Sequence, residues 1–106
     1  MRTLEFVVES QLIKKKTDCD FSNIVAGSIG YLKAKFYFSP EWTGCRKAAS
    51  FWADGNEYPV LLDNTDSCDI PPQALTGDRF SVSVTGVKSD DYKIKTTRTK
   101  VRQEVY

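Results

Sequence analysis

The stretch from Tyr31 to Asp63, YLKAKFYFSPEWTGCRKAASFWADGNEYPVLLD, decides how this chain folds. Its opening residues alternate strictly between an apolar face and a face of lysines and tyrosines, which predicts a half-buried strand that Pro40 ends. After an irregular corner at Trp42–Gly44, a second strand is expected. Asp54–Gly55 then supplies the positive φ angles of a two-residue hairpin turn, from which a third strand returns. The stretch therefore predicts three strands joined by one corner and one tight hairpin.

The two-residue turn also predicts the register of the hairpin. It pairs Phe51 with Tyr58, which directs Phe51 into the core and leaves Trp52 on the outer face beside Glu57. Trp42, a large ring at a strand-to-strand corner, is expected to plug one end of the core. The expected core residues are Phe36, Phe38, Trp42, Phe51, Phe80, Val82 and Val84.

The rest of the chain indicates short strands separated by turns. Strands are expected near residues 3–8, 12–16, 68–70, 79–87 and 92–99, the fourth of them with the cleanest alternation. Residues 17–30 are expected to form a loop or one helical turn, and residues 100–106 a frayed, solvated tail. About seven short strands in 106 residues predict an all-β, immunoglobulin-like antiparallel β-sandwich, with residues 1–106 forming one domain.

Composition narrows the location and the partners. The 15 basic and 14 acidic residues leave a net charge of +1, so no overall charge attracts the chain to nucleic acid or to an anionic membrane. The N-terminal segment lacks the apolar run of a signal peptide, which favours a soluble protein made inside the cell. Three widely spaced cysteines, Cys19, Cys45 and Cys68, fit reduced thiols better than a disulfide framework.

An enzyme is hard to build from these residues. The chain contains no histidine, the usual general base and the commonest zinc ligand, and none of its cysteines forms a CxxC pair. Asp63, Asp66 and Asp69 lack the spacing of a calcium loop and are interpreted as turn residues. We therefore expect no catalytic residue, no metal and no cofactor.

Two basic clusters have a structural interpretation. Lys14–Lys16 suit an exposed edge strand, because lysines there discourage pairing with another sheet. The second cluster has no aromatic residue interleaved with it for base stacking, so nucleic acid is not an expected partner. It consists of Lys93, Lys95, Arg98, Lys100 and Arg102.

The aromatic residues offer candidate contacts with a partner. Strand periodicity places Tyr31, Tyr37 and Trp52 on faces opposite the core, and exposed Tyr and Trp are favoured at protein interfaces. The other interpretation is that a second sheet or the segment 17–30 covers them.

The order of several motifs resembles a known family. SPEWTG, the strand KAASF, a proline turn before Leu75, the strand RFSVSVTGV and the threonine-rich KTTRT follow one another as in small phage and prophage proteins of Gram-positive bacteria. The chain looks most like the immunoglobulin-like N-terminal domain of the phage baseplate upper protein. That resemblance implies a structural protein of the virion tail, baseplate or capsid, present in the host cytoplasm during assembly. Its partners would be other virion proteins, with self-association as an option.

Two other functions fit a compact domain without catalytic residues. One is a small phage-encoded inhibitor that blocks a host defence protein by occupying its surface. The other is a carbohydrate-binding module that uses Trp52 and Tyr58 as a sugar platform.

Overall fold

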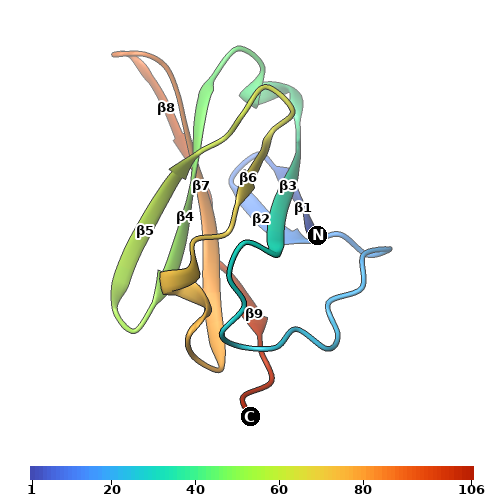
Figure 1. Ribbon diagram of the computed structural model, residues 1–106. Helices are drawn as coiled ribbons and strands as arrows, with labels where there is room; N and C mark the ends of the chain where they lie inside the picture. The colour runs from blue at the N-terminus through green and yellow to red at the C-terminus, as the bar shows by residue number, and fades with distance from the viewer.

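The computed structural model describes residues 1–106 and contains nine strands and two 3₁₀ turns (Figure 1). In chain order these are β1 (Arg2–Glu9), β2 (Leu12–Lys15), β3 (Leu32–Phe38), η1 (Pro40–Trp42), β4 (Arg46–Ala53), β5 (Asn56–Leu61), β6 (Ser67–Asp69), η2 (Pro72–Leu75), β7 (Arg79–Ser89), β8 (Tyr92–Lys95) and β9 (Thr99–Arg102). No helix in the molecule has the length and apolar character to cross a lipid bilayer.

The strands form two sheets around a shared core, which confirms the predicted all-β sandwich with nine strands in place of about seven. The first sheet has the order β2-β1-β3-β6. The second has the order β5-β4-β7, and both β8 and β9 pair with the free edge of β7. The chain passes from one sheet to the other between β3 and β4, β5 and β6, and β6 and β7.

One pair of strands departs from the antiparallel prediction. β1 and β3 run parallel, from Arg2 opposite Leu32 to Val8 opposite Phe38. A parallel neighbour needs a long crossover, and the segment between β2 and β3 supplies it. This segment has the predicted loop character, and the Arg2 guanidinium donates to backbone carbonyls of residues 20, 22 and 23 within it.

The hairpin of β4 and β5 has the predicted register. Phe51 lies opposite Tyr58 and Trp52 opposite Glu57, and the turn residues Asp54 and Gly55 have φ angles of 53° and 77°. Phe51 is fully buried, whereas Trp52 is half-buried on the other face. The turn chemistry and the alternation of the strand therefore agree on which side chains enter the core.

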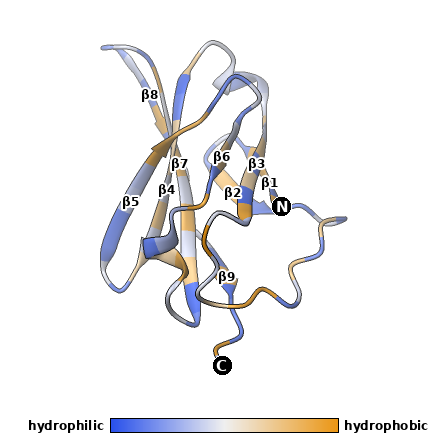
Figure 2. Cartoon of the chain, in the orientation of Figure 1, coloured by the Kyte–Doolittle hydropathy of each residue, from blue (hydrophilic) through white to orange (hydrophobic).

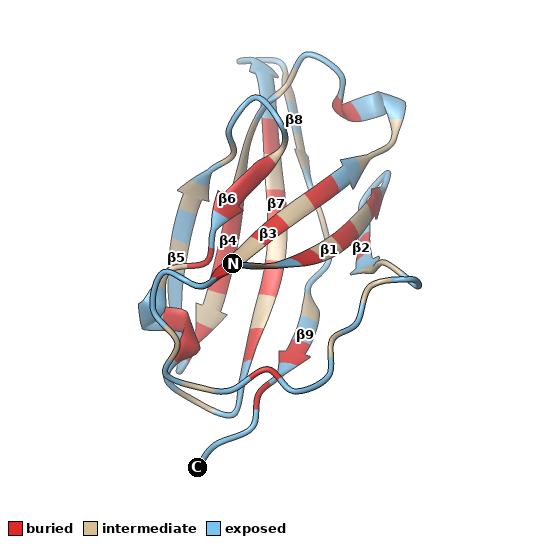
Figure 3. Cartoon of the chain, turned by 45° about the vertical axis from the view of Figure 1, so that its right-hand side comes forward, coloured by how far each residue is buried: buried red, intermediate tan, exposed pale blue.

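The core contains six of the seven residues predicted for it. Figure 3 shows the buried positions alternating along the inward faces of the strands. Trp42 is fully buried at one end, where its indole Nε1 donates to the Ser10 carbonyl 2.9 Å away. Phe38 was predicted to be a core residue but is only half-buried, because it ends β3 at the rim of the sandwich. The centre of its ring lies 5.0 Å from that of Trp42.

The C-terminal segment is ordered, and the prediction of a frayed tail is wrong. The last strand breaks after Lys95 and resumes as β9, where Val101 is fully buried beside Phe80. Beyond β9, the backbone N–H of Gln103 donates a hydrogen bond to the backbone carbonyl of Asp78 at 2.7 Å. The charged residues that suggested a tail are the outward half of an alternating strand.

Candidate binding surface

The outer face of the second sheet gathers cationic side chains. On β7, Ser81, Ser83 and Thr85 alternate away from the core, and the strands on either side place cations beside them. We call this surface the basic face. Its cations are Arg46, Arg79, Lys93, Lys95, Arg98, Lys100 and Arg102.

These cations have few carboxylate partners within the molecule. Only Arg79 has a carboxylate oxygen close by, that of Asp78 at 3.8 Å. The one carboxylate projecting from the strands of this face, Glu57, accepts a hydrogen bond from the Ser50 hydroxyl at 2.5 Å. Asp54 and Asp78 line the same hollow as Arg79, Arg98 and Lys100, so this face has seven cations near three carboxylates, and the rest of the chain has eight cations against eleven carboxylates. The net charge of +1 thus conceals an uneven distribution of charge.

Trp52 lies near the C-terminal end of β4, and the side chain of Arg98 covers its ring. The Arg98 guanidinium stacks 3.6 Å from the centre of the indole ring, and the indole Nε1 donates to the Ser83 hydroxyl at 3.0 Å. The ring and the cation therefore orient one another. Trp52 faces outward as predicted, but Arg98 rather than a bare aromatic ring is what a partner would meet.

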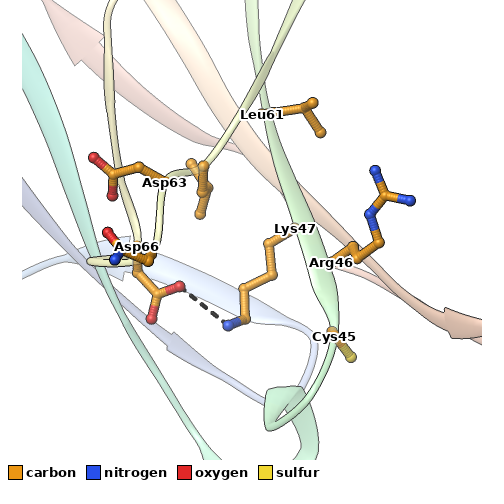
Figure 4. Close-up of a pocket in the computed structure, with 8 residues that line it drawn as sticks. Cys45, Arg46, Lys47, Leu61, Asp63 and Asp66 are labelled. Atoms are coloured by element: carbon orange, nitrogen blue, oxygen red, sulfur yellow. Dashed lines mark hydrogen bonds and ion pairs between the residues drawn. The ribbon is translucent and has the colours of Figure 1, made fainter.

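The end of the basic face that is uppermost in Figure 1 contains a hollow of about 280 Å³, lined by the apolar residues Ala48, Leu61 and Val87 and by Arg46, Lys47 and Thr85. Leu61 is 68% exposed, and Figure 2 shows the upper end of β5 as hydrophobic above a hydrophilic lower half. In Figure 4, the side chains of Leu61 and Arg46 point away from the Lys47–Asp66 pair. Sequence reasoning did not single out Leu61 or Val87, although consecutive leucines at 61 and 62 require one to face outward.

The outer face of the first sheet has a different character, because its charged groups contact one another. The Tyr37 hydroxyl donates to Glu5 Oε2 at 2.6 Å, a hydrogen bond that raises the pKa of Tyr37. Lys14 pairs with Glu9 at 3.2 Å. β2, which carries Lys14, is an edge strand of this sheet, as the run of lysines predicted.

The three predicted aromatic contacts do not form one site. Tyr31 and Tyr37 flank the two ends of β3, about 20 Å apart along an extended strand. Trp52 lies on the outer face of the other sheet. Tyr31 and Tyr37 are 50% and 41% exposed and remain separate candidates for contact. A single partner surface would have to wrap around the sandwich to meet all three.

The sugar platform is also contradicted. Tyr58 lies opposite Phe51 and packs against the core, whereas Trp52 occupies the alternate face of the same hairpin. Neighbouring positions along a strand point to opposite sides of the sheet. Trp52 and Tyr58 therefore cannot present their rings to the same sugar.

Asp63 and Asp66 lie between β5 and β6 and shape the chain, as predicted for turn residues. Asp63 Oδ1 accepts hydrogen bonds from the Thr65 hydroxyl and from the backbone amides of Thr65 and Ser67, and these bonds lower the pKa of Asp63. Asp66 pairs with Lys47 at 3.0 Å, next to a hollow of about 370 Å³ (Figure 4). Asp69 differs from the prediction, because it is an exposed residue of strand β6, opposite Lys33, and not a turn residue.

All three cysteines are free thiols, and Cys68 is buried. Burial raises the pKa of the Cys68 thiol to about 12. In the unfolded chain a thiol has a pKa of about 8.5. Above that value the unfolded state loses a proton that the folded state keeps, so this thiol should lower stability as the pH rises toward 12.

We therefore expect alkaline destabilisation to be smaller in Cys68→Ala. Between about pH 7 and about pH 10, its free energy of unfolding should fall by about 1–2 kcal/mol less than that of the parent. Urea unfolding at both pH values measures this difference. Cys45→Ala, at a half-buried thiol, is the control; an equal change in both variants would contradict the assignment.

Comparison with protein-family models and with curated proteins found no match for the chain. The likeness to the baseplate domain accordingly rests on the order of its sequence motifs.

Proposed function

We propose that this protein is a non-enzymatic structural component of a phage particle and acts through protein–protein contacts. The motif order supports the virion setting, and the tail, baseplate or capsid are the sites it favours. The partners would be other virion proteins.

The basic face is the observation that carries the protein-contact part of this proposal. Cations of one sign on a rigid sheet create a potential that steers and orients an oppositely charged partner. The sheet also keeps them in fixed register, because each of β7, β8 and β9 is hydrogen-bonded to its neighbour. A surface of this kind suits repeated docking in one orientation.

Quantitative mass spectrometry of purified phage particles tests the virion setting. We expect the protein to be retained in particles at a fixed ratio to a major structural protein through a density gradient at low ionic strength, where charge contacts are not screened. A protein abundant in infected cells but missing from particles would contradict the proposal. Synthesis early in infection, followed by absence from particles, would instead favour the inhibitor of a host defence protein.

A further inference from the structure

We propose that the upper end of the basic face docks an acidic protein segment, which inserts one apolar side chain into the hollow between Leu61 and Val87. The inference deepens the proposed function by naming the chemistry of the partner. The site comprises Arg46, Ala48, Leu61, Val87, Lys93 and Lys95.

Strand register brings these residues together from four strands. Leu61 lies opposite Ala48, Ala48 opposite Thr85, and Thr85 opposite Lys95. The adjacent row on the same face runs from Arg46 through Val87 to Lys93. Rows on one face are about 7 Å apart, so the cations lie within reach of one short peptide that also covers the hollow.

The charges at this end favour carboxylates. None of Arg46, Lys93 and Lys95 forms an ion pair within the molecule, and all three are exposed. Carboxylates of a partner would therefore gain charge-assisted hydrogen bonds without displacing an internal one.

The apolar hollow favours a polypeptide over nucleic acid. Three of its six lining residues, Ala48, Leu61 and Val87, are apolar, and Leu61 is 68% exposed although it lies on an ordered strand. Single-stranded nucleic acid is usually held by bases stacking on exposed aromatic rings. The one aromatic ring projecting from this face, that of Trp52, is stacked under Arg98. An acidic segment with a leucine-like side chain matches both the hollow and the cations.

A titration followed by two-dimensional ¹H–¹⁵N NMR tests the site directly. The probe is a capped peptide of glutamates with one central leucine, compared with the same peptide carrying serine instead of leucine. We expect amide shifts to cluster at Ala48, Leu61, Val87 and Lys95, and the leucine peptide to bind about tenfold more tightly. Shifts scattered over both sheets, or none at all, would overturn the proposal.

Two pairs of variants separate the contributions of charge and apolar contact. Lys93→Glu/Lys95→Glu should weaken binding of the leucine peptide about tenfold. Lys14→Glu/Lys33→Glu makes the same charge change on the first sheet and is the control. Its effect on the affinity should be less than about threefold, because salt screens charges that far from the site. Leu61→Ser should abolish the preference for leucine over serine. Leu12→Ser, at a leucine 52% exposed on β2, should not. Equal effects within either pair would overturn the site.

Two further outcomes would assign the surface to another occupant. Tighter binding of a single-stranded oligothymidylate of equal charge would make it a nucleic-acid surface. Concentration-dependent shifts at Leu61 and Val87 without any peptide would make it a contact between copies of the chain. The titration does not involve particles, so loss of the virion proposal would leave its result unaffected.

Discussion

Trp42→Ala is expected to lower the free energy of unfolding by about 3–5 kcal/mol, a large share of the stability of a domain of this size. The substitution removes a fully buried ring at the end of the sandwich. It also deprives the Ser10 carbonyl of its indole donor and Phe38 of its aromatic neighbour. Urea unfolding followed by circular dichroism measures the loss.

Trp52→Ala is the matched control for this prediction. It deletes the same side chain from the same fold, but the Trp52 ring is half-buried and packs on the outer face under Arg98. Its cost should be clearly smaller, because fewer core contacts are lost and water can reach the site. Comparable losses for the two variants would contradict the assignment of Trp42 as the residue that closes the core.

Gly86→Ala is expected to cost about 1–3 kcal/mol, through crowding rather than through a cavity. A Cβ atom at this position would lie 2.8 Å from Cε3 and Cζ3 of Trp42 and 3.2 Å from Cβ of Cys45. In a strand, alanine would otherwise be preferred to glycine, which loses more conformational entropy on folding. Gly86→Ala is therefore expected to destabilise the protein only because the indole packs flat against the backbone of β7.

A double-mutant cycle with Trp42→Leu checks this cause. With the smaller leucine at position 42, Gly86→Ala should become nearly neutral, so the two substitutions should couple by about 1–3 kcal/mol. The free energies of unfolding of both single variants and the double variant give the coupling. An unchanged cost of Gly86→Ala in the Trp42→Leu background would show that the strain arises elsewhere.

Local patterns predicted those parts of the fold that depend on neighbours in the chain. The strict alternation of residues 31–38 and the Asp54–Gly55 turn were enough to place Phe36 and Phe51 in the core and to pair β4 with β5. The parallel pairing of β1 with β3 was missed because it depends on where a long crossover returns. β9 was missed because its cations concealed the inward Val101.

The candidate site was harder to predict from the sequence, because it too depends on contacts between residues far apart in the chain. The cations between Lys93 and Arg102 were recognised as a cluster, but interpreted as part of a solvated end of the chain. Arg46, Leu61 and Val87 belong to three different strands, and only the register of the second sheet makes them neighbours of Lys93. Tyr37 faces outward as expected, but the hydrogen bond from its hydroxyl to Glu5 was not foreseen, because it joins two strands whose parallel pairing was not predicted.

The uneven charge of the molecule has a consequence for the symmetry of any assembly that it joins. Two copies related by a two-fold axis through the basic face would bring like charges together, which electrostatic repulsion disfavours. Contact of this face with the acid-rich remainder of another copy is instead heterologous. Such head-to-tail contacts close into rings when the rotation allows and otherwise extend as filaments. The charge distribution thus favours head-to-tail contacts over two-fold contacts through the basic face.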